Sequence, residues 1–392
     1  MTDLELDFQD TATAFADKSD QELKEKHRIF RLLNSPILNS LGTRSAKLAL
    51  SIGLPVEGLI KSTVFEQFCG GETIEECEPT IKRLGASHIG TILDYAVEGR
   101  HTEDDFDKTK DEIMRTIDRA KDDPDLPFSV FKVTGIAPLG TLERLSKKKK
   151  LDAKSQTKCE HIYSRVKEIC SHAYAVGQPV FIDAEESWIQ DAIDRLATEM
   201  MEKFNLERPI VYNTFQLYRT DRLQFLKDSR RQAKNDGYIL GAKLVRGAYM
   251  EKERERAAQI GYPSPIHADK AAVDRDYDSA VDYCLNHLDD ISFVAGTHNE
   301  TSTELLAQKL IDRGLPHDHP HVNFSQLMGM SDNLSYVLAK NGYNVSKYVP
   351  YGPIRESIPY LTRRAEENSA VTGQMSRELE MIERELKRRK QA

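Results

Sequence analysis

The sequence of 392 residues lacks a long hydrophobic run. No stretch approaches the roughly eighteen apolar residues that a membrane-spanning helix needs. Positive charge is not in excess either, because 55 Lys and Arg stand against 63 Asp and Glu and give a formal net charge of −8. That balance argues against a nucleic-acid partner, since phosphate backbones bind basic surfaces.

Cysteine is scarce and unpatterned. The five cysteines are odd in number and show no CxxC spacing, which indicates reduced thiols in a cytosolic type of compartment. Residues 1–7 are acidic and fit neither a signal peptide nor an Arg-rich transit peptide. We therefore expect a cytoplasmic protein. Peripheral contact with the inner membrane stays open, and a mitochondrial location is less favoured.

Apolar runs of strand character recur from residue 88 onward, each followed by a helical or turn pattern. They cover residues 88–95, 128–134, 179–185, 210–215, 241–247, 291–298, 321–327 and 345–350. Strands that alternate with helices predict a parallel sheet with crossover helices. Eight such units predict a closed (βα)8 barrel, which takes about 250 residues and leaves room for an extension.

Polar residues gather at the C-terminal ends of these runs, where a barrel of this type carries its active site. They are Lys132, Asp183 with Glu185 and Glu186, Gln216, Arg246, His298 with Asn299, and Tyr348. Core packing alone does not explain polar ends on so many strands. The sequence therefore predicts that these side chains converge on one face of the barrel.

After the eighth run, Arg363 and Arg364 stand together on a predicted helix. Glu367 lies at i+4 and i+3 from them and Tyr360 at i−3 from Arg363, so one helical face can carry all four. Two guanidinium groups match a carboxylate, and a pair is costly to hold together without an anion. By itself the pair is equally compatible with a solvated basic face.

Two segments resemble a dinucleotide-binding motif and a metal site, but their surroundings in the sequence argue against both. No GxGxxG follows a strand, so Gly70-Gly71 and Gly247 are not a dinucleotide fingerprint. The segment 317–321 reads His-Asp-His-Pro-His, but its proline and its place before a strand predict a loop at the opposite end of the barrel. We expect no metal site there.

The two ends of the chain read as helices outside the barrel. We expect a helical arm over residues 1–85, the barrel over 86–372 and an amphipathic helix over 373–392. For residues 41–61 we favour packing against the barrel. The alternative is that they contact a membrane surface. The C-terminal stripe of Met375, Leu379, Ile382 and Leu386 suits the barrel, a partner or a membrane surface equally.

Five segments together resemble the motif set of the proline dehydrogenases, FAD-dependent enzymes on a distorted (βα)8 barrel. They are GAKLVRGAY at 241–249, FIDAEE at 181–186, GTHN at 296–299, KYVPYG at 347–352 and YLTRR at 360–364. The resemblance runs from about residue 88 to about residue 370. It is stronger to the single-function enzymes than to the catalytic domain of the large bifunctional proteins.

The resemblance implies roles for individual residues. The implied catalytic residues are Lys132, Asp183 and Lys243. The implied substrate site comprises Lys132, Tyr249, Leu327, Tyr348, Tyr360, Arg363, Arg364 and Glu367. The implied cofactor site comprises Asp183, Ala184, Gln216, Lys243, Val245, Arg246, Gly247, Ala248, Thr297, His298 and Asn299. The bifunctional branch carries Arg in place of Lys243 and Lys in place of Arg246, so which of the two contacts flavin N5 stays open.

The implied function is oxidation of L-proline to 1-pyrroline-5-carboxylate by hydride transfer to flavin N5. Electrons would pass to a membrane quinone, and the reaction would be the first step of proline catabolism. The alternatives are a hydroxyproline dehydrogenase on the same scaffold, a non-catalytic barrel that binds proline, and a Schiff-base aldolase that uses Lys132 or Lys243. The electron acceptor and the oligomeric state do not follow from the sequence.

Overall fold

The computed structural model describes residues 6–33, 58, 61–97, 102–147, 152–370 and 374–391, with the side chains of 62, 153, 154, 365–370, 374 and 375 left out. The stretch 41–61, for which membrane contact was an alternative, therefore lies almost wholly outside the described residues. Within the described ranges, no helix combines the length and the apolar character that crossing a bilayer would need.

Eight parallel strands close into a barrel in sequence order, as predicted. They are β1 (Ile89–Tyr95), β2 (Phe128–Lys132), β3 (Val180–Asp183), β4 (Val211–Gln216), β5 (Leu240–Val245), β6 (Ile291–Gly296), β7 (Val322–Leu327) and β8 (Val345–Tyr351). β1 and β8 pair in register from Ile89 opposite Val345 to Tyr95 opposite Tyr351, which closes the barrel. Their side chains are mostly buried because helices cover the outside and a packed core fills the inside.

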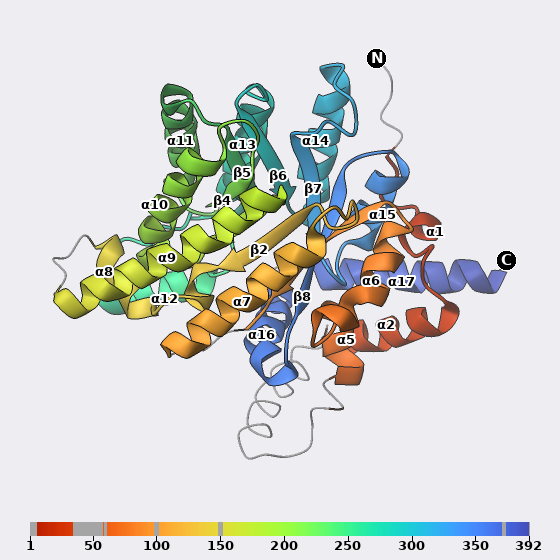
Figure 1. Cartoon of the computed structure of the whole chain (residues 1–392). Helices are drawn as coiled ribbons and strands as arrows, with labels where there is room; N and C mark the ends of the chain where they lie inside the picture. Colours follow the sequence, from red (N-terminus) through yellow and green to blue (C-terminus); the bar gives the residue numbers. More distant parts are fainter. Residues whose placement is uncertain are drawn as a thin grey trace.

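A ring of helices surrounds the strands (Figure 1). It consists of α7 (Glu103–Ala120), α9 (Ala153–Val176), α10 (Ser187–Phe204), α11 (Arg222–Asp236), α13 (Lys270–Leu285), α14 (Glu300–Asp312) and α15 (Asp332–Lys340). The helix after β8, α16 (Ile354–Ala370), instead packs against η1 (Lys61–Phe65) at the end of the barrel where Lys132 lies. The loops also contain η2 (Val133–Gly135), α8 (Leu139–Ser146) and α12 (Met250–Ile260). Four of these helices, α7, α9, α13 and α14, begin after a side chain that accepts a backbone N–H. Thr102, for example, forms a reciprocal capping box with Asp105 at the start of α7.

Aromatic rings fill the barrel interior below the polar strand ends. The rings of Phe128 and Phe181 stack with centroids 4.6 Å apart, and the ring of Tyr212 meets Phe181 edge-on at 5.5 Å. The same cluster contains Ile92, Val130, Val294 and Tyr348. Groups at the strand ends therefore rest on an apolar floor that excludes water from below.

Helices from both ends of the chain pack together at one side of the barrel. α1 (Thr11–Ala14) and α2 (Asp20–Leu33) lie beside α17 (Gln374–Gln391), as Figure 1 shows in red and violet-blue. Met381 and Ile382 of α17 are buried, and Leu379 and Leu386 pack against the same cluster. The described part of the apolar stripe, Leu379, Ile382 and Leu386, is thus covered by the chain itself, whereas the side chain of Met375 lies outside the described residues. α5 (Glu66–Phe68), which follows η1 (Lys61–Phe65), and α6 (Ile74–Gly85) lead into β1.

Candidate active site

Asp183, the last residue of β3, is the centre of a buried charged group at the C-terminal end of the barrel. Its carboxylate accepts hydrogen bonds from Lys132 Nζ at 2.9 Å, Lys243 Nζ at 2.6 Å and Tyr348 Oη at 2.6 Å. These partners come from β2, β5 and β8, so barrel closure brings four strands together here. Burial alone would raise the pKa of Asp183, but Lys132 and Lys243 outweigh it and lower that pKa. Asp183 is therefore a carboxylate.

A second carboxylate, Asp94, was not among the predicted site residues. It lies near the end of β1, is only 2% exposed and receives a hydrogen bond from Lys132 Nζ at 3.1 Å. Burial raises the pKa of Asp94 in spite of the lysine beside it. The available signal was an acidic residue near the end of an apolar run, at the position that other strands fill with site residues.

Lys132 is held between these two carboxylates. Burial by itself would lower its pKa, but Asp183 and Asp94 more than compensate and raise the pKa well above its usual value. Lys132 is thus held as a cation between the two acids. A lysine in this state does not accept a proton.

The two cations of β5 and its loop face different surroundings, which sequence reasoning could not decide. Lys243 points to the barrel axis, with Nζ 4.5 Å from the ring centroid of Tyr348. Arg246 points toward the loop after β6, where it donates to Thr297 Oγ1 at 2.6 Å and Ser302 Oγ at 2.9 Å. It also donates to Asp274 at 2.9 Å. Lys243 therefore belongs to the charged group around Asp183, whereas Arg246 stabilises the loop after β6 through its hydrogen bonds.

The paired arginines lie on α16, above Lys132. Arg363 lines a small cavity, about 20 Å³, together with Asp94, Lys132 and Tyr360. The guanidinium of Arg364 lies 5.2 Å from the ring centroid of Tyr360, and Arg364 is only 6% exposed. Arg363 is half-buried beside Asp94 and Lys132, and Arg364 is buried against Tyr360, so the pair is not a solvated basic face. The side chain of Glu367 lies outside the described part of the chain.

The predicted apolar wall residues contact the charged group, the arginine pair or one another. Tyr348 is buried against the charged group, and Leu327 is half-buried at the end of β7. Tyr249 precedes α12 and its ring centroid is 6.0 Å from the guanidinium of Arg363. Tyr360 lies on α16 next to the two arginines. The structure therefore brings the predicted substrate residues with described side chains to one end of the barrel.

The residues predicted for the cofactor lie at the ends of β3 to β6. Gln216 is 2% exposed, and its Nε2 donates to the carbonyl of Glu185 at 2.9 Å, whereas its Oε1 has no hydrogen-bond partner among the described residues. Gly247 has φ of +134°, and a Cβ there would meet the Tyr218 ring at 2.5 Å. Gly247 and Ala248 are exposed beside Val245 and Arg246, and Ala184 is half-buried.

The loop after β6 supplies Thr297, His298 and Asn299. Asn299 caps α14 by accepting the N–H of Ser302 at 3.0 Å. Burial, then the charges of Lys347 and Arg364, lowers the pKa of His298 to about 3, so its ring is neutral. Its Nδ1 lies 2.9 Å from Ser331 Oγ.

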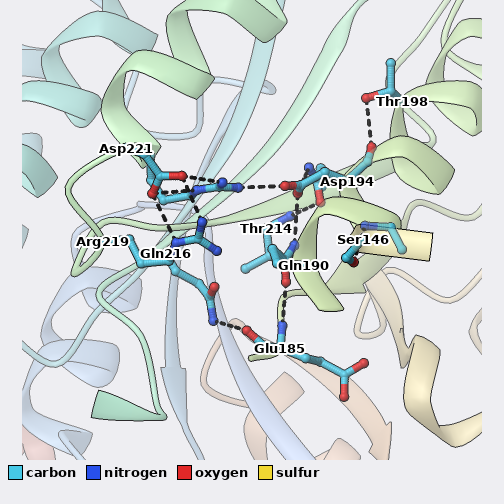
Figure 2. A network of polar contacts seen from close by, with 12 residues as sticks. Ser146, Glu185, Gln190, Asp194, Thr198, Thr214, Gln216, Arg219 and Asp221 are labelled. Atoms are coloured by element: carbon cyan, nitrogen blue, oxygen red, sulfur yellow. Dashed lines mark hydrogen bonds and ion pairs between the residues drawn. The ribbon is translucent and has the colours of Figure 1, made fainter. Parts of the chain in front are cut away.

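A buried polar network supports the ends of β3 and β4 from outside, and sequence reasoning missed it (Figure 2). The N–H of Glu185 donates to Gln190 at 2.7 Å, and Gln190 donates to Asp194 at 2.9 Å. Asp194 then accepts from Arg222 at 2.6 Å. The spacing of Gln190 and Asp194 on the buried face of α10 was the signal for it. The network fixes the backbone that carries Asp183 and Gln216.

Glu185 adds a titratable group near Lys132. It accepts hydrogen bonds from the N–H of Thr134 at 3.0 Å and from the Thr134 hydroxyl. Burial outweighs these bonds and raises the pKa of Glu185 to about 7. Among the described residues, no group of three or more His, Cys, Asp or Glu is placed to hold a metal ion.

Comparisons with known proteins give one consistent family. A family model described as "Proline dehydrogenase" matches residues 77–377. Proline dehydrogenase 1, mitochondrial, from Arabidopsis thaliana is 31% identical over 98% of this chain and 86% of its own length. The carbapenem antibiotics biosynthesis protein CarD from Pectobacterium carotovorum subsp. carotovorum is 36% identical over 85% of this chain and 86% of its own length.

Solved structures agree on the fold. Proline utilization A from Bdellovibrio bacteriovorus superposes with a TM-score of 0.72 at 20% identity, over 92% of this chain and 38% of that protein. The protein of the same name from Corynebacterium freiburgense gives 0.64 at 16% identity, over 94% of this chain and 35% of that one. This chain thus spans less than two fifths of either protein. At these identities the likeness concerns the fold alone.

Proposed function

We propose that this chain, which belongs to the proline dehydrogenase family, oxidises L-proline to 1-pyrroline-5-carboxylate with FAD as the hydride acceptor. The observation that carries the proposal is the buried group of Lys132, Asp183, Lys243 and Tyr348 at the barrel mouth, below the arginine pair of α16. This arrangement offers cations to a small carboxylate and rings to an apolar body.

Different side chains would bind the carboxylate and the ring of the substrate. Arg363 and Arg364 bind the substrate carboxylate, because their forked donors match its two oxygens. Glu367, on the same helix, would fix the geometry of the arginines. Tyr249, Leu327, Tyr348 and Tyr360 enclose the pyrrolidine ring and keep out water. Lys132, held as a cation, neutralises negative charge beside the substrate, and Asp183 sets the position of Lys132 and Lys243.

The residues at the strand ends fit a flavin. A buried Gln216 Oε1 without a protein partner suits a ligand N–H, and the exposed backbone at Gly247 leaves room for close approach. The residues that would hold FAD are Asp183, Ala184, Gln216, Lys243, Val245, Arg246, Gly247, Ala248, Thr297, His298 and Asn299. When bound, FAD would supply the acceptor for the hydride of Cδ, the ring carbon next to nitrogen that bears no carboxylate, while the ring nitrogen loses a proton to leave the imine. A cation such as Lys243 stabilises negative charge that develops beside it.

The wider setting is proposed from the family alone. Electrons would pass to a membrane quinone, and the reaction would open proline catabolism. A Schiff-base aldolase that uses Lys132 is disfavoured. A nucleophilic lysine needs a depressed pKa, whereas the pKa of Lys132 is raised.

The purified protein should contain FAD, and anaerobic L-proline should bleach its absorption band near about 450 nm, the region of an oxidised flavin electron acceptor. Spectra before and after the addition measure this. A non-catalytic proline-binding barrel would stay colourless and take up no FAD, and that result would exclude the proposed function. A hydroxyproline enzyme would instead bleach preferentially with trans-4-hydroxyproline.

Tyr348 should set the preference for proline over hydroxyproline. Its ring lies against the substrate space, where a bulky group excludes an added hydroxyl that an apolar pocket alone discriminates poorly. Tyr348→Ser should narrow the ratio of kcat/KM between the two substrates. Tyr348→Phe is the matched control, because it loses the 2.6 Å bond to Asp183 but keeps the ring. Tyr348→Phe should lower kcat/KM for both proline and hydroxyproline and keep the ratio between them. If Tyr348→Ser leaves that ratio unchanged, the Tyr348 ring only packs at the barrel rim and does not select the substrate.

A further inference from the structure

Four buried ionisable side chains form a second cluster that has no part in the reaction described above. Lys26 of α2, Asp332 of α15, Lys347 of β8 and Glu378 of α17 are between 1% and 5% exposed. Lys26 Nζ lies 2.5 Å and Lys347 Nζ 2.9 Å from the two oxygens of Asp332. Two cations and two acids balance, so the cluster joins both ends of the chain to the barrel at no net charge.

The cluster surrounds the turn between β7 and α15. Lys347 Nζ donates to the carbonyl of Met330, and the N–H of Ser331 donates to Glu378 Oε1. Ser331 has φ of +50°, a left-handed conformation that a serine adopts at a cost and keeps where its surroundings hold it. The hydrogen bond to Glu378 stabilises this conformation, although Glu378 belongs to a helix outside the barrel.

The conformation of Ser331 has a consequence at the predicted cofactor loop. Its hydroxyl lies 2.9 Å from His298 Nδ1, while the N–H of Leu327 points to Nε2 of the same ring at 3.5 Å. The neutral ring of His298 is therefore placed by the β7–α15 turn and not only by its own loop. A continuous chain of contacts runs from Glu378 through Ser331 to His298.

We propose that Glu378 is a positioning residue for the cofactor site. It fixes Ser331, Ser331 orients the imidazole of His298, and helix α17 thereby contributes to FAD binding without touching FAD. The inference rests on the proposed function, because it needs His298 to contact the flavin. A helix that only covered the side of the barrel would affect stability and leave FAD affinity unchanged.

The test measures the Kd of FAD for the apoprotein by quenching of flavin fluorescence. Ser331→Ala and Glu378→Ala should each raise Kd on the order of five- to tenfold, the loss expected for one buried hydrogen bond. The double variant should be little worse than either single one, because the two residues act in one chain. Glu378→Gln keeps an acceptor oxygen and should recover most of the affinity.

Glu385→Ala is the matched control. Glu385 lies on the same face of α17 two turns further on, is fully buried, and binds Arg388 and Arg389 at 2.7 Å. Its loss should lower the urea midpoint of unfolding and leave the Kd of FAD unchanged. Equal weakening by Glu385→Ala and Glu378→Ala would overturn the inference, and so would normal FAD affinity in Ser331→Ala and Glu378→Ala. Failure of the wild-type protein to bind FAD would instead overturn the proposed function, and the inference with it.

Discussion

Asp183→Ala is expected to lower kcat/KM for L-proline by roughly 10²- to 10³-fold or more. The change leaves Lys132 and Lys243 buried without the carboxylate that both bind at 2.6 to 2.9 Å. Removing one partner of a buried ion pair typically costs about 3–5 kcal/mol. That cost falls on the free energy of unfolding. The effect on rate comes from the displaced lysines, because a shift of about 1 Å in a positioned group can cost about 10²-fold in rate. A loss of 10²- to 10³-fold corresponds to about 2.7–4 kcal/mol of activation free energy.

Steady-state kinetics with a parallel measurement of bound flavin test this expectation. Asp94→Asn is the comparison, because it removes the other carboxylate of Lys132 and leaves Asp183 in place. Its effect should be clearly smaller. An Asp183→Asn protein that keeps both FAD and wild-type kcat/KM would show that the carboxylate only orders the strand ends.

Arg363→Met and Arg364→Met should each weaken the apparent affinity for L-proline about tenfold or more, with FAD binding preserved. A charge-assisted hydrogen bond to a carboxylate contributes about 1.5–3 kcal/mol. Arg364 is almost fully buried, and Arg363 lines the cavity beside Lys132, so solvent does not replace the lost contact. The dependence of the rate of flavin reduction on proline concentration measures the apparent affinity for proline, and the flavin content of the purified variants measures FAD binding.

Arg355→Met serves as the control for this pair. Arg355 lies on the same helix but is exposed, so its loss should leave proline affinity unchanged. If Arg363→Met and Arg364→Met bind proline normally and lose FAD, the two arginines belong to the cofactor site and the proposed carboxylate clamp is wrong.

The strands could be located from the sequence because each is buried on both faces. Such strands are continuous apolar runs, and the run predicted at 321–327 differs from β7 (Val322–Leu327) by one residue. The short helices α8 and α12 lie in loops and are additional to the eight strand–helix units. The alternation of strands and helices in the sequence therefore did not predict them. Proline dehydrogenase motifs were recognised in the same way, as short local segments.

The sequence by itself determined the barrel, its order of strands, the family and the end of the barrel that carries polar side chains. Only the tertiary structure decided that Asp94 joins Lys132, that Lys243 faces Asp183 while Arg246 faces Thr297, and that α17 packs on the N-terminal helices. The reason is distance along the chain. Lys132 and Asp183 are 51 residues apart and Lys26 and Asp332 are 306 apart, so no local pattern records their contact. Such pairs form because barrel closure and helix packing leave buried charges no other partner.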